Sequence, residues 1–174
     1  QYNIALDDLR APLDEEERSR IEVEDDYTLI LVDIPTIEER NDKEWYGTIP
    51  LAIIITKERI FTVCLEDTPV LTAFMDGRVR NFYTYMKTRF ILQILYKNAT
   101  MFLHYLRIID KKSEFVEKKL HAATRNQELL ELLELEKSLV YFTTSLRSNE
   151  VVLEKMMKVE SIKHYPEDEE LLED

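Results

Sequence analysis

The stretch TIPLAIIITKERIFTVCL, residues 48–65, decides the fold class. It holds two apolar runs, 48–56 and 60–65, which are joined only by the charged tripeptide Lys57-Glu58-Arg59. Three residues are too few for a crossover helix, so the two runs are expected to be adjacent antiparallel strands. The rest of the chain therefore has to supply the other strands of an antiparallel sheet and the helices that cover it.

Upstream of this pair, two more segments have the composition of strands. Residues 20–24 alternate, with Ile21 and Val23 on one face, and residues 27–34 form a mostly apolar run that is expected to end at Pro35. The polar segment 38–45 is expected to be a loop. A short helix is expected before the strands, over residues 4–10.

Downstream, the apolar period changes from that of a strand to that of a helix. Asp67-Thr68-Pro69 is typical of a helix start, and this short helix is expected to end near Gly77. From Asn81 to Leu120 apolar residues recur at helical spacing without a proline, which predicts a helix of about 40 residues, roughly 60 Å long. A break is expected near residues 123–126.

The next segment carries a heptad-like seam, in which apolar residues recur at alternating steps of three and four. We expect it to pack against the apolar stripe of residues 91–109, so that the two long helices form an antiparallel hairpin. On this view, Leu139→Ala should cost roughly 2–5 kcal/mol. The seam consists of Leu132, Leu135, Leu139, Phe142, Leu146, Leu153 and Met156, with Asn149 in an intermediate position.

These elements predict an α+β fold with a mostly antiparallel sheet, short flanking helices and a long antiparallel helical hairpin. Within one compact domain, residues 1–80 would form the sheet part and residues 81–165 the helical hairpin. Residues 166–174 begin with Pro166, continue with acidic residues and then Leu171 and Leu172, and look like the first turns of a further helix.

Composition excludes several classes of function. With 23 basic and 35 acidic residues, the net charge of −12 argues against nucleic acid as a partner. Two glycines are too few for a GxGxxG or Walker phosphate loop, and the single Cys64 allows neither an intrachain disulfide nor a CxxC site. Residues 90–109 contain too many polar side chains for a membrane helix, so the chain is expected to be soluble as given.

Catalytic constellations are not found in the sequence, and we expect no enzyme activity. His104, His121 and His164 are the only histidines, and none belongs to an HExxH pattern. Carboxylate clusters are the only groups suited to a metal ion, and their oxygen atoms suit Mg²⁺ or Ca²⁺. From spacing alone, a solvated face is the interpretation that each cluster favours. The clusters are Asp7-Asp8, residues 14–17, residues 24–26, and residues 167–170 with Glu173-Asp174.

Six segments follow one another in an informative order: LDDL (6–9), RIE (20–22), DYTLILV (26–32), PLAIIIT (50–56), RIFTV (59–63) and LLED (171–174). This ordered set resembles the CorA family of magnesium transporters, and the resemblance covers nearly all 174 residues. The family's Gly-Met-Asn pore signature and its two membrane helices are not in the chain and would lie beyond Asp174.

The resemblance implies a cytoplasmic domain on the inner side of the cell membrane, in a homopentamer that admits Mg²⁺ passively. In the family, this domain senses intracellular divalent cations between subunits, at carboxylates that match Asp8 and Asp174. Asp7 and Glu173 are neighbours that could substitute for them. The bound Mg²⁺ would be regulatory, weak and held mostly through water, and the domain would connect to the membrane through the missing helices.

Two other interpretations remain open at the level of the sequence. The chain could belong to a related Zn²⁺ transporter, which the missing pore would distinguish. It could also be a soluble helical scaffold that self-associates through its leucine seam. About 20 apolar residues following Asp174 in the natural gene would argue against the scaffold.

Overall fold

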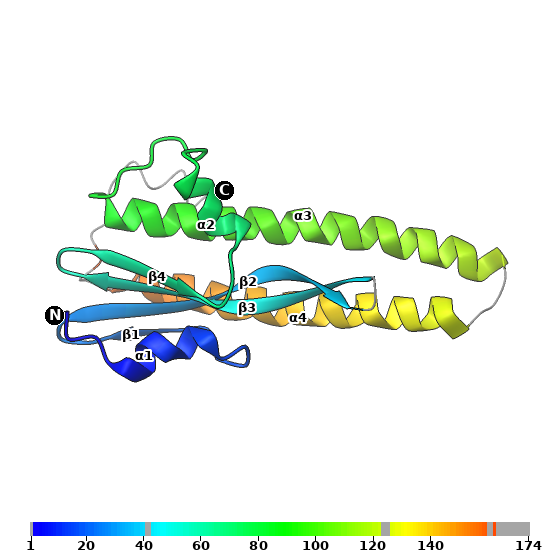
Figure 1. Ribbon diagram of the computed structural model, residues 1–174, viewed down its shortest axis with the longest axis horizontal. Coiled ribbons are helices and arrows are strands. Elements are labelled where there is room, and N and C mark those ends of the chain that lie inside the picture. The colour runs from blue at the N-terminus through cyan, green and yellow to red at the C-terminus, as the bar shows by residue number, and fades with distance from the viewer. Residues whose placement is uncertain (1, 41–42, 123–125, 160–161, 163–174) are drawn as a thin grey trace.

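The computed structural model describes residues 2–40, 43–122, 126–159 and 162. It confirms the predicted α+β class: a four-stranded antiparallel sheet in the order β1-β2-β3-β4 is combined with short and long helices (Figure 1). The elements are α1 (Leu6–Arg10), the 3₁₀ helix η1 (Ala11–Leu13), β1 (Arg20–Val23), β2 (Tyr27–Arg40), β3 (Lys43–Thr56), β4 (Ile60–Cys64), α2 (Pro69–Met75), α3 (Lys87–Ala122) and α4 (Asn126–Met156).

The central strands β2 and β3 are longer than the sequence indicates. They pair in continuous register from Tyr27↔Thr56 to Arg40↔Lys43. The prediction of a loop over residues 38–45 is therefore wrong for residues 38–40 and 43–45, while residues 41–42 lie outside the described residues. Aromatic contacts hold this outer part of the strands in place. Tyr46 is fully buried, and the Trp45 ring lies 5.5 Å from that of Tyr141 on α4.

Pro35 and Pro50 lie inside these strands without breaking the ladder. The backbone of alternate β2 residues faces β1: the Glu24 N–H donates to the Tyr27 carbonyl at 2.8 Å. Pro35 has the same orientation, but β1 pairs no further along β2 than Leu31, so no strand needs an N–H there. Pro50 likewise faces the β4 side, one residue beyond the Leu51↔Cys64 pair. A proline is tolerated where its missing donor faces an open edge, so the expected end of β2 at Pro35 is also wrong.

Both faces of β2 and β3 are buried, which explains their continuous apolar runs. Ile30, Val32 and Ile34 belong to a core cluster that contains Ile91 of α3 and Val152 of α4. The alternate residues belong to a second cluster on the opposite face, where Leu29 and Leu31 lie with Ala11 of η1. The sheet is thus a middle layer between the long helices and the α1–η1 segment (Figure 1).

The two long helices form the predicted hairpin. Helix α3 begins at Lys87 rather than at the expected Asn81, and it is continuous through residues 90–120. Of the expected break near residues 123–126, residues 123–125 lie outside the described residues, and α4 begins at Asn126. In Figure 1 the joined ends of the helices extend well past the strands. Phe102, Tyr105 and Ile109 of α3 share a third buried cluster with Leu135 and Phe142 of α4, as predicted.

The seam of α4, however, is rotated from the predicted one. Leu139 is 40% exposed, whereas Ser138, Ser145 and Val152 are buried. The buried residues of α4 are Leu135, Ser138, Phe142, Ser145, Val152 and Met156. The rotation has a packing cause: α4 contacts the sheet as well as α3, and small serines allow its backbone to approach β2 and β3.

Helix α2 follows its sequence signals closely. The Thr68 hydroxyl accepts a hydrogen bond from the Val70 N–H at 3.2 Å, and Pro69 occupies the first helical position. Gly77 follows with φ of +66°, a left-handed conformation that glycine adopts without a Cβ penalty. The start and end of this helix are therefore confirmed.

Candidate functional site

The predicted acidic pair Asp7-Asp8 lies on α1, a helix of only five residues. Its N-cap is Ala5, which offers no side-chain oxygen to the first amide groups. A helix this short is not stable alone in water, so its position depends on contacts with the sheet. Leu9 packs against the apolar cluster on that face, and Ala11 is buried in it.

Tyr27, the first residue of β2, makes the polar contact that joins this helix to the sheet. Its hydroxyl donates a hydrogen bond to Oδ2 of Asp8. The same hydroxyl oxygen accepts a hydrogen bond from the Ala5 N–H at 3.3 Å. One phenol therefore bridges the N–H of the N-cap residue and the carboxylate three residues later, and Tyr27 itself is only 7% exposed.

The electrostatics around this contact are acidic. The hydrogen bond to Asp8, together with burial, raises the pKa of the Tyr27 phenol above its ordinary value. Asp7 is exposed and Asp8 is half-buried. Within the described part of the chain neither carboxylate forms an ion pair, so their oxygen atoms are not neutralised by a lysine or arginine.

This donor set fits a hard divalent cation only in part. Carboxylate oxygens are the ligands that Mg²⁺ prefers, and Mg²⁺ commonly keeps several waters when few protein ligands reach it. Among the described residues, no group of three or more His, Cys, Asp or Glu side chains could hold a metal ion. The other predicted site residues, Asp174 and Glu173, lie outside the described residues, as does the expected helix over 166–174. Whether they approach Asp8 stays a prediction.

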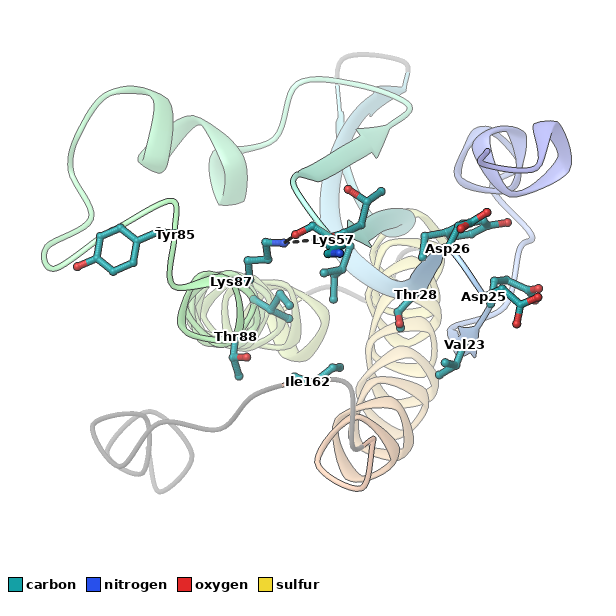
Figure 2. Close-up of a pocket in the computed structure, with 14 residues that line it drawn as sticks. Val23, Asp25, Asp26, Thr28, Lys57, Tyr85, Lys87, Thr88 and Ile162 are labelled. Atoms are coloured by element: carbon teal, nitrogen blue, oxygen red, sulfur yellow. Dashed lines mark hydrogen bonds between the residues drawn. The ribbon is translucent and has the colours of Figure 1, made fainter. Parts of the chain in front are cut away.

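A pocket of about 440 Å³ lies near this end of the sheet, between the β1–β2 turn and the start of α3. Figure 2 shows Asp25 and Asp26 on the opposite side of the pocket from Tyr85. Lys87 crosses toward the β3–β4 turn, where its amino group donates to the carbonyls of Thr56 and Lys57 at 2.7 and 2.6 Å. This lysine therefore anchors α3 to the sheet.

Three comparisons with known proteins bear on this arrangement. The model of the CorA-like Mg²⁺ transporter protein family matches residues 1–174. The chain belongs to this family. The cobalt/magnesium transport protein CorA of Methanocaldococcus jannaschii is 28% identical over 162 residues, which cover 88% of this chain and 48% of that protein. The chain thus spans about half the length of this relative.

Solved CorA structures share the fold. The soluble domain of CorA from M. jannaschii superposes with a TM-score of 0.83 at 28% identity, covering 98% of this chain and 68% of that one. The complete CorA magnesium transporter from the same organism gives a TM-score of 0.79 at 26% identity, covering 98% of this chain and 54% of that one. The match therefore extends through the sheet and the helical hairpin.

The comparisons agree with the expectation of a transport rather than an enzymatic role, because the named relatives are transport proteins. No helix in the described part of the CorA-like chain combines the length and the apolar character that a membrane crossing requires. The resemblance proposes Asp8 as a site residue, which stays a prediction, and no sequence pattern indicates its contact with Tyr27. Tyr27 lies in the matching segment DYTLILV, where the pattern indicates only the start of a strand.

Proposed function

We propose that this chain is the cytoplasmic regulatory domain of a CorA-type transporter that admits Mg²⁺ passively. The observation that carries the proposal is the match of the whole chain to the CorA-like family and to a CorA soluble domain. The full protein would continue into membrane-spanning helices and assemble as a homopentamer. The domain itself would lie on the inner side of the membrane.

The regulatory role would depend on carboxylates at the boundary between subunits. Asp8 of one subunit and Asp174 of the next would face each other, with Asp7 and Glu173 as possible substitutes. Two carboxylates at close range repel each other, and a hydrated Mg²⁺ between them offsets that repulsion. When internal Mg²⁺ falls, loss of the ion would favour a state in which the subunits move apart.

The test uses the full-length transporter with Asp8→Asn and Asp174→Asn combined. We expect this variant to need a higher internal Mg²⁺ concentration for closure while its pore still conducts. A matched variant, Asp110→Asn with Glu154→Gln, removes two exposed carboxylates from the long helices and should close as the parent does. If the Asp8/Asp174 variant also closes at the parental concentration, the two residues are ordinary surface carboxylates.

A further inference from the structure

The contact between Tyr27 and Asp8 links a long strand of the sheet to a short helix. Tyr27 begins β2, one of the two 14-residue strands of the sheet, and belongs to a buried cluster with Leu29 and Leu31. Asp8 sits on a five-residue helix without a side-chain N-cap. A further hydrogen bond joins the residues before α1 to the turn between β1 and β2, since Asn3 Nδ2 donates to Asp26 Oδ2 at 2.5 Å.

We propose that Tyr27 is a positioning residue, which holds the Asp8 carboxylate in the orientation that binds Mg²⁺ between subunits. This inference rests on the proposed function. The phenol occupies Oδ2 of Asp8 and leaves Oδ1 for the hydration shell of the ion. It also accepts the Ala5 N–H, so the hydroxyl fixes both the side chain and the helix that carries it.

A positioned carboxylate binds more tightly than a mobile one because less rotational freedom is lost when the ion arrives. The strand supplies the rigidity that α1 lacks, since Tyr27 pairs with Thr56 and its ring is almost fully buried. The sequence hides this relationship, because the two residues are nineteen positions apart. Tyr27 would act on the ion only through Asp8.

Tyr27→Phe isolates the hydroxyl, because the ring and its packing remain. The experiment follows the melting temperature of the full-length protein as MgCl₂ is added, since an ion that binds the native state raises this temperature. We expect Tyr27→Phe to raise the Mg²⁺ concentration at half-effect by about three- to tenfold, the factor that corresponds to the net contribution of one ordinary hydrogen bond. In an Asp8→Asn background the same change should add no shift.

Tyr46→Phe is the matched control. Tyr46 is another buried tyrosine whose hydroxyl donates to a carboxylate, in this case Glu44 at 2.8 Å, and it lies at the other end of the sheet. The Tyr46→Phe substitution should leave the Mg²⁺ response unchanged. The difference between the metal-free melting temperatures of this variant and the parent measures how much the loss of one such hydroxyl affects folding alone.

Two results for Tyr27→Phe alone would overturn the inference and keep the proposed function: a parental Mg²⁺ response, or a fall in metal-free melting temperature as the only effect of the substitution. The same holds if Tyr27→Phe still shifts the Mg²⁺ concentration at half-effect in the Asp8→Asn background. A parental response in Asp8→Asn would instead remove Asp8 from the proposed function, and the inference with it.

Discussion

At the scale of single residues, Asn149 shows how a side chain can replace a missing strand. Its amide donates to the Asp33 carbonyl at 2.7 Å and accepts from the Asp33 N–H at 2.8 Å. β1 does not pair with β2 at Asp33, because its pairing extends along β2 only as far as Leu31. Asn98 of α3 donates to the same carbonyl at 2.8 Å. Both long helices are thereby bonded to one peptide group of the sheet.

Asn149→Ala should lower the free energy of unfolding by about 1–3 kcal/mol, because it leaves the partly buried Asp33 N–H without its acceptor. Unfolding in urea measures this change. Glu150→Ala, the exposed neighbour on the same helix, should change stability by less than about 0.5 kcal/mol. Equal effects of the two substitutions would show that water replaces the Asn149 amide at no cost.

The carboxyl group of Asp33 makes the stability of the folded protein depend on pH. Burial raises its pKa above the ordinary value of 3.8, and hydrogen bonds from Ser145 and Ser19 partly oppose the rise. A raised pKa in the folded state means that the native protein binds this proton more tightly than the unfolded chain does. Its contribution to stability is therefore present below pH 3.8 and is lost as the pH rises through the higher, folded value.

We expect Asp33→Asn to become more stable relative to the parent as the pH rises from just below 3.8, until the difference reaches a plateau. Urea unfolding of both proteins across this range gives the difference directly. Asp110→Asn removes the same charge from an exposed position and provides the reference. A difference that falls with pH would mean that the folded state stabilises the Asp33 carboxylate instead.

At the scale of elements, sequence patterns succeeded where the signal was local. The cap at Thr68, the proline at Pro69 and the glycine after the helix define α2, and helical periodicity defines α3. The patterns failed where three-dimensional neighbours decide. Whether Pro35 ends a strand depends on where β1 stops, and which face of α4 is buried depends on the sheet beneath it. For the site, family resemblance gave Asp8, but no pattern connects it to Tyr27.

The rotated seam of α4 reverses one energetic expectation. Leu139 is 40% exposed, so Leu139→Ala should cost only about 1 kcal/mol, because a large part of this side chain stays in contact with water in the folded protein. Phe142→Ala should cost about 3–5 kcal/mol, because its fully buried ring stacks edge-on against Phe102 at 5.0 Å. Urea unfolding of the two variants compares them, and a larger loss for Leu139→Ala would restore the predicted seam.

At the scale of the whole molecule, the long helices are supported at two places. Near the middle of the sheet, the buried cluster around Ile30 and Ile53, here called the inner cluster, contains residues of both helices. Farther out, Tyr46 of β3 lies in the buried cluster with Phe102 and Phe142, here called the outer cluster. Lys112 of α3 adds an ion pair with Glu44 at 2.6 Å. The tip of the β2–β3 ribbon therefore acts as a third partner for the outer half of the hairpin.

Removing this partner should loosen one half of the hairpin selectively. We expect Tyr46→Ala to speed amide hydrogen exchange in residues 102–120 and 126–142, while exchange in residues 49–54 stays close to that of the parent, because a cluster that opens locally need not unfold the rest. Hydrogen exchange followed by mass spectrometry resolves these segments. Ile53→Ala, which opens a cavity in the inner cluster, should instead speed exchange in the strands and in both helices beside them. If Tyr46→Ala raises exchange equally in all segments, the two clusters form one cooperative unit, and the strand tip contributes to global stability rather than to the outer hairpin.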